Sequence, residues 1–331
     1  MLGLSRTPGH LIRLAQQVHT ASWAQRLHGE LTGPQYAALV AVAMEPGIDQ
    51  SRLAELASLD KNTAAVLVRR LAARGWIQRA ADPADGRRQL LRLTAPARVA
   101  LRYMTPAAAL VQEDLLQPVD AGRRDAFIHL LARIARVAAI PRLAGRGAGA
   151  PAAEVRVTEV PVAEVPVAEV PVLPMARTPG YLIRRAQARH ASIWGDVVGS
   201  ELTGPQYAVL AALVLQPGAD QAAIGRLASL DPSSTADIVG RLDRGGWLRR
   251  VLPSGSGRRM SWRLSSAAAD RLERITPLAE QVQAEFLSPL EPPEASCFID
   301  DLALIAYRGA PPAPGDPGLS ATLAHRSARL S

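Results

Sequence analysis

The chain contains two copies of one sequence, separated everywhere by 171 residues. ELTGPQYA at residues 30–37 returns unchanged at 201–208, and LASLD at 56–60 returns at 227–231. A single offset aligns all of these segments, so neither copy carries an insertion relative to the other. Because each copy is long enough to bury its own core, the repeat predicts two domains of the same fold.

Between the copies lies a segment of different composition. Its pentads EVRVT, EVPVA, EVPVA and EVPVL place a proline at nearly every fifth position. Proline cannot donate to a strand ladder and favours extended chain, which at roughly 3.1 Å per residue could reach about 90 Å. We therefore predict a first domain over 1–145, a semi-rigid linker over 146–174, a second domain over 175–310 and a disordered tail over 311–331.

Apolar spacing and helix caps predict a mostly helical first copy. A 3, 4, 3 rhythm of apolar residues runs from Pro8 to His28 and predicts a long first helix. Thr32 with Gln35 forms a capping box for a second helix. Asp49 and Asp60 can each begin a further short helix.

The two short helices and the residues after them predict a winged helix-turn-helix. The second of them, Asp60–Arg74, would be the helix that enters the major groove. Trp76–Ala80 and Gln89–Leu93 read as a hairpin, and two long helices follow, the last over Asp120–Ala138. We predict a mainly α fold with a small β-hairpin wing: two winged helix-turn-helix units whose long flanking helices form a pseudo-dimer.

The motifs LTGPQYAAL, RRLAARGWI and DPADGRRQLLRLT resemble those of the MarR-type transcriptional regulators. The wing motif is the most specific: Asp85-x-Arg87, five residues, then Leu93-Thr94. The resemblance covers Arg6–Ala138 and Arg177–Tyr307. It implies a regulator, a repressor in our prediction, that binds pseudo-palindromic double-stranded DNA as a dimer, with half-sites roughly 10 bp apart.

Two copies in one chain would supply both halves of such a dimer, and the half-sites need not be identical. The long linker leaves open whether the copies pair within one chain or between two chains, so further self-association remains an alternative.

Polar residues at the start of the second short helix and arginines at the wing tip are the candidate DNA contacts. A helix N-terminus suits phosphate and base-edge contacts, and wing arginines can reach the backbone or minor groove. Capping of helix-end amides is the alternative for the short polar side chains. The predicted DNA-binding residues are Lys61, Asn62, Thr63, Arg69, Arg87 and Arg88, with Ser233, Ser234, Arg258 and Arg259 in the second copy. The resemblance assigns Asp85 the support of the wing arginine.

The copies differ in charge. Residues 1–145 carry 19 basic and 11 acidic side chains, whereas 175–310 carry 15 and 14. Counterion release scales with the number of phosphates neutralised. The second copy also departs from the first at three positions: Ser256 for Asp85, Ser265 for Thr94 and Gly240 for Arg69. We predict asymmetric DNA binding with the first copy as the main anchor.

The resemblance also implies that a small molecule, often a phenol or an aromatic carboxylate, releases the DNA. An arginine can clamp a carboxylate, a histidine can hydrogen-bond a phenol, and an aromatic ring can wall a pocket. Three first-helix residues of these types, Arg13, His19 and Trp23, recur as Arg184, His190 and Trp194. Arg13 lies off the face that the histidine and tryptophan share, so it would have to reach around or contribute across the interface. Core packing, salt bridging and interface hydrogen bonding are the structural alternatives.

Other kinds of site have weaker sequence support. The only cysteine, Cys297, stands beside Phe298 and is predicted to be a buried interface residue; a redox sensor is the alternative. The six histidines show no metal-ligand spacing, and we predict no cofactor. The sequence contains no nucleophile elbow, phosphate loop or paired carboxylates, so we do not predict an enzyme. The alternative function is a winged-helix protein-interaction scaffold whose second copy has lost DNA binding.

The remaining bulk properties concern partners and compartment. The net charge of +8 suits a polyanionic partner. Neither an export signal nor a run of roughly 18 apolar residues is present, so we predict a cytoplasmic protein without a membrane partner.

Overall fold

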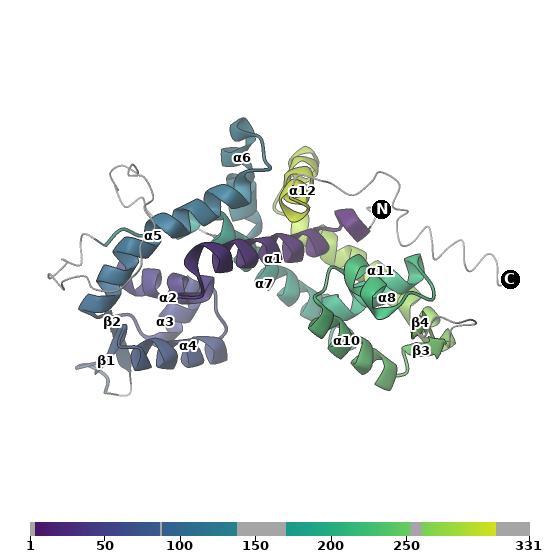
Figure 1. Ribbon diagram of the computed structural model, residues 1–331, viewed down its shortest axis with the longest axis horizontal. Helices are drawn as coiled ribbons and strands as arrows, with labels where there is room; N and C mark the ends of the chain where they lie inside the picture. Colours follow the sequence, from purple (N-terminus) through teal and green to yellow (C-terminus); the bar gives the residue numbers. More distant parts are fainter. Residues whose placement is uncertain (1–3, 87, 138–169, 252–259, 309–331) are drawn as a thin grey trace. The chain divides into compact units, whose positions relative to one another are not determined.

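The computed structural model describes residues 4–86, 88–137, 170–251 and 260–308 (Figure 1). Its contacts divide the chain into two compact units. Gln16–Arg185 forms one, named here the N-repeat unit; Met1–Ala15 with Ala186–Ser331 forms the other, the C-repeat unit. Each unit therefore combines most of one copy with the start of the first helix of the other copy. Residues 138–169, which include most of the predicted linker, and the predicted tail 311–331 lie outside the described residues.

Both copies contain the same elements in the same order (Figure 1). The first copy forms α1 (Pro8–Leu27), α2 (Gly33–Met44), α3 (Gln50–Ala57), α4 (Lys61–Ala73), β1 (Ile77–Ala81), β2 (Gln89–Leu93), α5 (Ala95–Leu116) and α6 (Ala121–Ile134). The second forms α7 (Pro179–Val197), α8 (Gly204–Leu215), α9 (Gln221–Ala228), α10 (Pro232–Arg244), β3 (Leu248–Val251), β4 (Ser261–Leu264), α11 (Ser266–Leu287) and α12 (Pro292–Ala306). The predicted class, mainly α with a small hairpin in each copy, is confirmed.

Side-chain caps begin the helices where the sequence predicts. The Thr32 hydroxyl accepts from the Gln35 amide, and the Gln35 side chain accepts from the Thr32 amide at 2.8 Å, which completes the capping box. Asp49 and Asp60 accept backbone amides at the starts of α3 and α4. The largest difference from a predicted boundary is at the end of α6, which lies at Ile134 rather than Ala138, because Arg136 adopts a left-handed backbone with φ 49°.

Each hairpin is antiparallel and is joined to the start of its helix-turn-helix. β1 pairs with β2 from Ile77 opposite Leu93 to Ala81 opposite Gln89. Leu91 of β2 also exchanges backbone hydrogen bonds with Gly47 and Ile48, just before α3. Asp220 and Ser261 form the corresponding bridge in the second copy. The wing is therefore fixed to the helix-turn-helix in both units.

The second helix of each copy is the centre of its core. Residues 36–42 of α2 and 208–214 of α8 are buried throughout. α3 and α4 pack on α2, and α9 and α10 pack on α8. Across the described ranges, the structure contains no helix with the length and apolar character needed to cross a membrane.

Candidate functional site

The exposed face of α4 is basic. Lys61, Asn62, Thr63 and Arg69, all predicted DNA contacts, are exposed, and so is Arg70, which the sequence reasoning omitted. The Asp60 carboxylate accepts from the Thr63 amide at 2.9 Å, so a cap sets the first turn and leaves these side chains to solvent.

The equivalent face of α10 has less unpaired charge: Gly240 stands at the position of Arg69, and Arg244 is an exposed arginine of the last turn. Ser233 is exposed and Ser234 is half-buried, at the positions of Asn62 and Thr63. Asp237 and Arg241 are also exposed and form an ion pair of 2.8 Å one turn apart. An aspartate on this face repels phosphate and neutralises the nearest arginine. The sequence reasoning missed Asp237, which comparison with its counterpart, Val66, would have revealed.

The wing of the first copy is held by an ion pair. Arg88 contacts the Asp49 carboxylate at 2.6 Å and Asp82 at 3.8 Å. The Arg52 amide and then Arg88 lower the pKa of Asp49. As placed, Arg88 joins the wing to the N-terminus of α3, although its side chain remains half exposed at 53%. The Asp85 carbonyl accepts from the Arg88 amide at 2.9 Å.

The other wing arginines, Arg87, Arg258 and Arg259, lie outside the described residues. One predicted departure of the second copy is structurally conservative. Ser265 caps α11 and donates to the Gly246 carbonyl at 2.8 Å, as Thr94 does with the Gly75 carbonyl at 2.7 Å.

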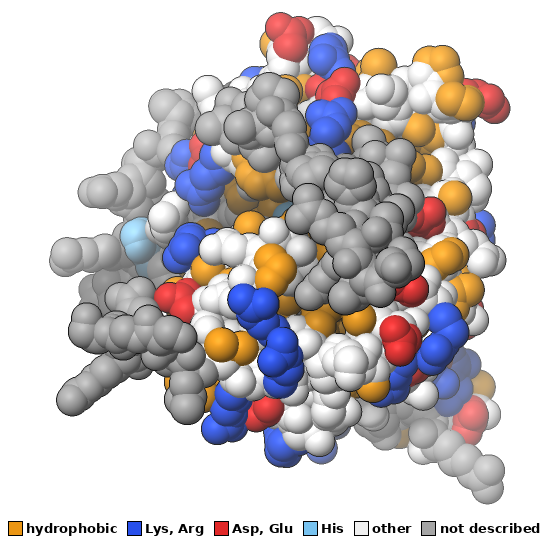
Figure 2. Space-filling view, turned by 90° about the vertical axis from the view of Figure 1, so that its right-hand side faces the viewer, with side chains coloured by type: hydrophobic (Ala, Val, Ile, Leu, Met, Phe, Trp, Pro, Cys, Tyr) orange, Lys and Arg blue, Asp and Glu red, His pale blue; other side chains and the backbone are white. Residues whose placement is uncertain are grey.

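Figure 2 looks onto the side of the molecule that carries α10, β3 and β4 in Figure 1. Over the visible part of this side, basic and acidic side chains are interspersed and do not form one basic patch (Figure 2). This distribution agrees with the near-neutral balance of the second copy.

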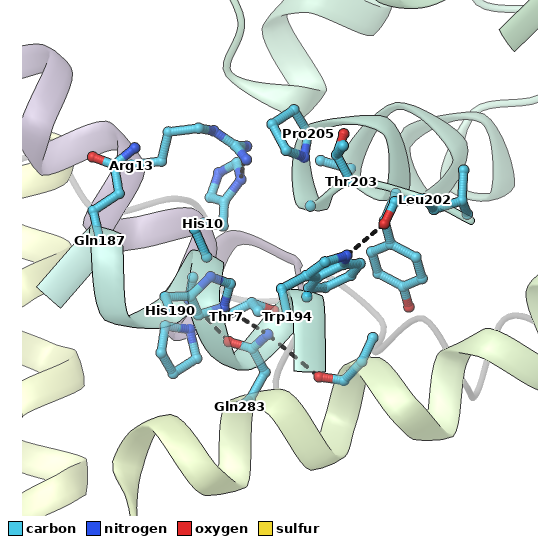
Figure 3. A pocket seen from close by; sticks show the side chains of 18 of the residues that line it. Thr7, His10, Arg13, Gln187, His190, Trp194, Leu202, Thr203, Pro205 and Gln283 are labelled. Atoms are coloured by element: carbon cyan, nitrogen blue, oxygen red, sulfur yellow. Dashed lines mark hydrogen bonds between the residues drawn. The ribbon is translucent and has the colours of Figure 1, made fainter. Parts of the chain in front are cut away.

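The C-repeat unit contains a cavity of about 620 Å³ (Figure 3). It is lined by the starts of α1 and α8, by α7 and by α11. Trp194, Leu202, Pro205 and Tyr207 supply apolar and aromatic walls. The Trp194 ring nitrogen donates to the Leu202 carbonyl at 2.6 Å, so the ring is fixed with its polar atom satisfied. Ligand pockets in proteins are commonly about 300–1,000 Å³.

Arg13 brings a half-buried positive charge to this cavity. Its guanidinium donates to the Ala228 carbonyl at 2.6 Å and to His10 Nδ1 at 3.2 Å, and its Nε has no partner. Figure 3 shows the guanidinium beside the His10 ring. Burial lowers the pKa of Arg13 to about 10, which still leaves it charged at neutral pH. No carboxylate of the described residues forms an ion pair with it.

A histidine and a glutamine form the floor of the cavity. The Gln283 carbonyl oxygen accepts from the Gly9 amide at 2.9 Å, which turns its NH₂ toward His190 Nε2 at 3.2 Å. Burial lowers the pKa of His190 to about 4, so the ring is neutral at pH 7. A Cβ on Gly9 would lie 2.1 Å from this ring, which explains why the RTPG motif ends in glycine.

The N-repeat unit contains the equivalent pocket with only about 20 Å³ of space. His19, Trp23, Tyr36 and Gln112 line it, and Gln112 accepts from the Gly180 amide at 2.8 Å. Burial likewise lowers the pKa of His19 to about 4.

The six predicted ligand residues thus form two groups, and each group combines the arginine of one copy with the histidine and tryptophan of the other copy. Arg13 lies with His190 and Trp194, and Arg184 lies with His19 and Trp23. The sequence reasoning missed the paired glycines and glutamines, Gly9 with Gly180 and Gln112 with Gln283. Their identity at the constant offset was the available signal.

The prediction that Cys297 is buried is wrong, because α12 turns this side chain to solvent while its neighbour Phe298 is buried. Among the side chains in the described ranges, no group of three or more His, Cys, Asp or Glu is placed to hold a metal ion.

Comparison with known proteins gives matches to each copy. The model of the MarR family matches residues 30–88 and 200–259. The transcriptional regulator HosA of Escherichia coli O111:H- is 37% identical over 125 residues, which are 38% of this chain and 92% of HosA. The transcriptional repressor NicR of Pseudomonas putida is 33% identical over 127 residues, 38% of this chain and 80% of NicR.

Solved structures match over a single copy. The transcriptional regulator PcaV from Streptomyces coelicolor, in complex with its natural ligand, is 36% identical with a TM-score of 0.40. The match covers 42% of this chain and 99% of PcaV.

Proposed function

This chain belongs to the MarR family of transcriptional regulators, and we propose that it is a repressor whose N-repeat unit anchors operator DNA and whose C-repeat unit binds the releasing ligand. NicR is named as a transcriptional repressor, which supports repression rather than activation for this chain. Since one polypeptide carries two winged helices, we propose that one chain covers both halves of a pseudo-palindromic or asymmetric operator.

The exposed charge of α4 is the observation that carries the DNA-binding proposal. Lys61, Arg69 and Arg70 extend from one helix whose N-terminus is capped and exposed. Within the described ranges none of the three is held in an ion pair. Unpaired cations on a helix of a helix-turn-helix are the groups that replace counterions on DNA phosphates.

The chemistry of the cavity supports a monocyclic aromatic carboxylate as the ligand. Arg13 is a half-buried cation that no carboxylate of the described residues pairs with, and a ligand carboxylate would supply the counter-charge. Neutral His190 and Gln283 offer hydrogen bonds to a ring substituent, and Trp194 and Tyr207 flank the space for the ring. The cavity is large enough for such a molecule.

The same arginine supports a route from ligand to DNA. Arg13 bonds the Ala228 carbonyl at the end of α9, and His10 Nε2 lies 3.2 Å from the Ser229 hydroxyl in the turn before α10. A carboxylate that competes for the Arg13 guanidinium would weaken these contacts. The orientation of α10 would then be less tightly fixed.

A second function is favoured for the C-repeat unit by the ion pair of Asp237 with Arg241. A winged helix in which one of the recognition-face arginines is neutralised by an aspartate suits a protein-interaction scaffold that no longer binds DNA. Salt dependence separates the two possibilities, because counterion release is specific to the polyanion.

The test of DNA binding uses fragments recovered by genome-wide mapping of bound DNA. Fluorescence anisotropy between 50 and 200 mM salt should show a steep loss of affinity, with a log-log slope of roughly −0.9 per phosphate contact. A flat dependence, or no specific fragment, contradicts the anchor role of α4.

The ligand is tested on the same complex. Benzoate and its 2-, 3- and 4-hydroxy derivatives are titrated, and at least one should lower the operator affinity of wild type but not that of Arg13→Gln. Arg26→Gln, which changes an exposed arginine of the same helix, is the control that should respond as wild type does. Equal release from Arg13→Gln and wild type contradicts the role given to Arg13.

A further inference from the structure

The two ligand pockets are built from the same side chains but differ thirtyfold in space. His19, Trp23, Tyr36 and Gln112 correspond one to one with His190, Trp194, Tyr207 and Gln283. The C-repeat cavity measures about 620 Å³ and the N-repeat pocket about 20 Å³, which is space for roughly one water molecule. The difference must therefore come from what lies against these shared residues.

Part of the filling is the end of the linker. The segment Val170–Met175, called the plug, enters the N-repeat unit before α7. The Thr105 hydroxyl donates to the Pro171 carbonyl at 2.9 Å, and the Leu173 amide donates to the Tyr36 hydroxyl at 3.4 Å. Leu173 and Met175 line the pocket, and Met175 is 4% exposed.

The polar groups that hold the plug have equivalents in the C-repeat unit, where they make other hydrogen bonds. The Tyr207 hydroxyl, equivalent to that of Tyr36, donates to the Thr276 hydroxyl at 3.3 Å and remains on the wall of the open cavity. Thr276 in turn donates to the Leu272 carbonyl of its own helix at 2.8 Å.

A tyrosine completes the filling. Tyr181 occupies the position that His10 has in the other unit, is 6% exposed, and lines the N-repeat pocket. Its hydroxyl donates to the Leu56 carbonyl at 2.7 Å, so the larger ring is fixed in place. Burial of a whole tyrosine ring removes space that a ligand ring would need.

Side chains of α7 also hold the first helix-turn-helix. In the N-repeat unit, Tyr181, Arg184 and Arg185 donate to the carbonyls of Leu56, Ala57 and Glu55 at the end of α3. Arg185 also contacts the Ser58 hydroxyl at 3.1 Å, and the residue at its position in the other copy is Leu14. The Arg184 contact has a counterpart in the bond from Arg13 to the Ala228 carbonyl, whereas Leu14 cannot make the hydrogen bonds of Arg185.

We propose that each chain binds one ligand, in the C-repeat cavity, because the plug and Tyr181 permanently occupy the N-repeat pocket. This inference rests on the proposed ligand-binding function and assigns it to one of two repeated sites. It follows that the ligand acts on the helix-turn-helix of α9 and α10, whereas that of α3 and α4 keeps its DNA-binding conformation. Saturating ligand should therefore weaken operator binding without removing the salt-dependent contribution of α4.

The number of sites is measured on the full chain by isothermal titration calorimetry with the hydroxybenzoate panel, and with 1-anilinonaphthalene-8-sulfonate as an independent aromatic anion. Wild type should bind one molecule per chain. His190→Ala should weaken binding at least tenfold, and His19→Ala, the equivalent change in the filled pocket, should change it less than twofold.

An opened variant tests the plug directly. Leu173→Gly with Tyr181→His should raise the stoichiometry to two per chain, with His19→Ala then removing the added site. The reverse change His10→Tyr, which places the tyrosine of the filled pocket at the equivalent position of the C-repeat cavity, should lower ligand affinity there at least tenfold. Thermal melts monitored by circular dichroism confirm that each variant is folded, and a variant that is not folded is replaced by Leu173→Ala, which should give the second site with lower affinity.

The outcomes separate the inference from the function on which it rests. Two equal sites in wild type, reduced in the same way by both histidine variants, overturn the inference and leave ligand-controlled release intact. A stoichiometry of one that persists in the folded opened variants overturns the role of the plug. Failure of every probe to bind wild type overturns the ligand part of the proposed function, and the inference with it.

Discussion

The recognition helices α4 and α10 share a scaffold and differ in surface chemistry. Asp60 and Asp231 cap them with the same 2.9 Å bond to the third helical residue, and Gly75 and Gly246 follow them with the same φ of 72°. On the exposed face, however, Arg69 is replaced by glycine and Val66 by Asp237. Residues that maintain the fold have been kept in both copies, while those that face a partner have diverged.

The two pockets also share most of their residues and differ at a few positions. The histidine, tryptophan and glutamine are the same in both units, and the pockets differ where Tyr181 of the N-repeat unit stands in place of His10. The copies are therefore unequal in two separate features. The exposed face of α4 carries the more unpaired positive charge, and the C-repeat unit has the larger cavity.

Acid should destabilise the C-repeat unit most. Burial lowers the pKa of His10 to about 3 and those of His190 and His19 to about 4, from 6.5. Because the folded-state pKa values are lower, the unfolded chain takes up protons first, and stability present above pH 6.5 is lost as pH falls toward 4. At pH 5 each histidine costs about 2 kcal/mol, so about 4 kcal/mol is lost by the C-repeat unit against about 2 kcal/mol by the N-repeat unit.

Pulse proteolysis in urea at pH 7.5 and pH 5, with fragments identified by mass, measures this difference. His10→Gln should remove about half of the acid sensitivity of the C-repeat unit and so make the two units about equally sensitive. Loss of both units at the same urea concentration at both pH values contradicts the burial argument.

Removal of the basic face of α4 should have the next largest effect. Lys61→Ala with Arg69→Ala should weaken operator binding about 10- to 100-fold and make the salt slope shallower by about 2, because two phosphate contacts are lost. Ser233→Ala with Arg241→Ala in α10 is the matched control and should change affinity less than about threefold. Equal losses in anisotropy titrations mean that the recognition helices contribute equally.

The repeated glycines should respond unequally to the same change. A Cβ on Gly180 or Gly9 would lie 2.1 Å from the ring of His19 or His190. The His190 ring can move into the open cavity, whereas the filled pocket leaves His19 no space. Gly180→Ala should therefore cost about 1–3 kcal/mol, and Gly9→Ala less than about 1 kcal/mol. Chemical denaturation measures both, and equal costs contradict the filled pocket.

The smallest effect should come from restoring the residue of the first copy in α10. Asp237→Val removes a carboxylate from the recognition face and frees Arg241, so operator affinity should rise a few-fold, about 1 kcal/mol or less. Asp196→Asn, an exposed neutral substitution on α7, is the control for net charge. No gain beyond that control indicates that α10 does not contact the operator.

Much of the fold could be predicted from local signals. The caps at Thr32, Asp49 and Asp60 and the strands on either side of the wing lie within a residue or two of their predicted places. Such signals are local because a cap or a turn depends on the next few residues only. The end of α6 was not predicted, because the residue that ends it in a left-handed conformation is Arg136, whereas glycine or asparagine usually occupies such a position.

The candidate site was only partly visible in the sequence. Arg13, His19 and Trp23 were found because they recur, yet the sequence did not show which of them meet. The exposure of Cys297 and the pairing of Arg88 with Asp49 also depend on residues distant in the chain.

The sequence by itself determined that this protein is a repeat of one winged-helix regulator and that its first copy is the more basic, because offset, caps and charge are properties of neighbouring residues. Only the tertiary structure decided that Arg13 serves the pocket of His190 and Arg184 that of His19, and that one pocket is open and the other filled. Both depend on how side chains from different helices occupy the same volume, which a linear pattern does not encode.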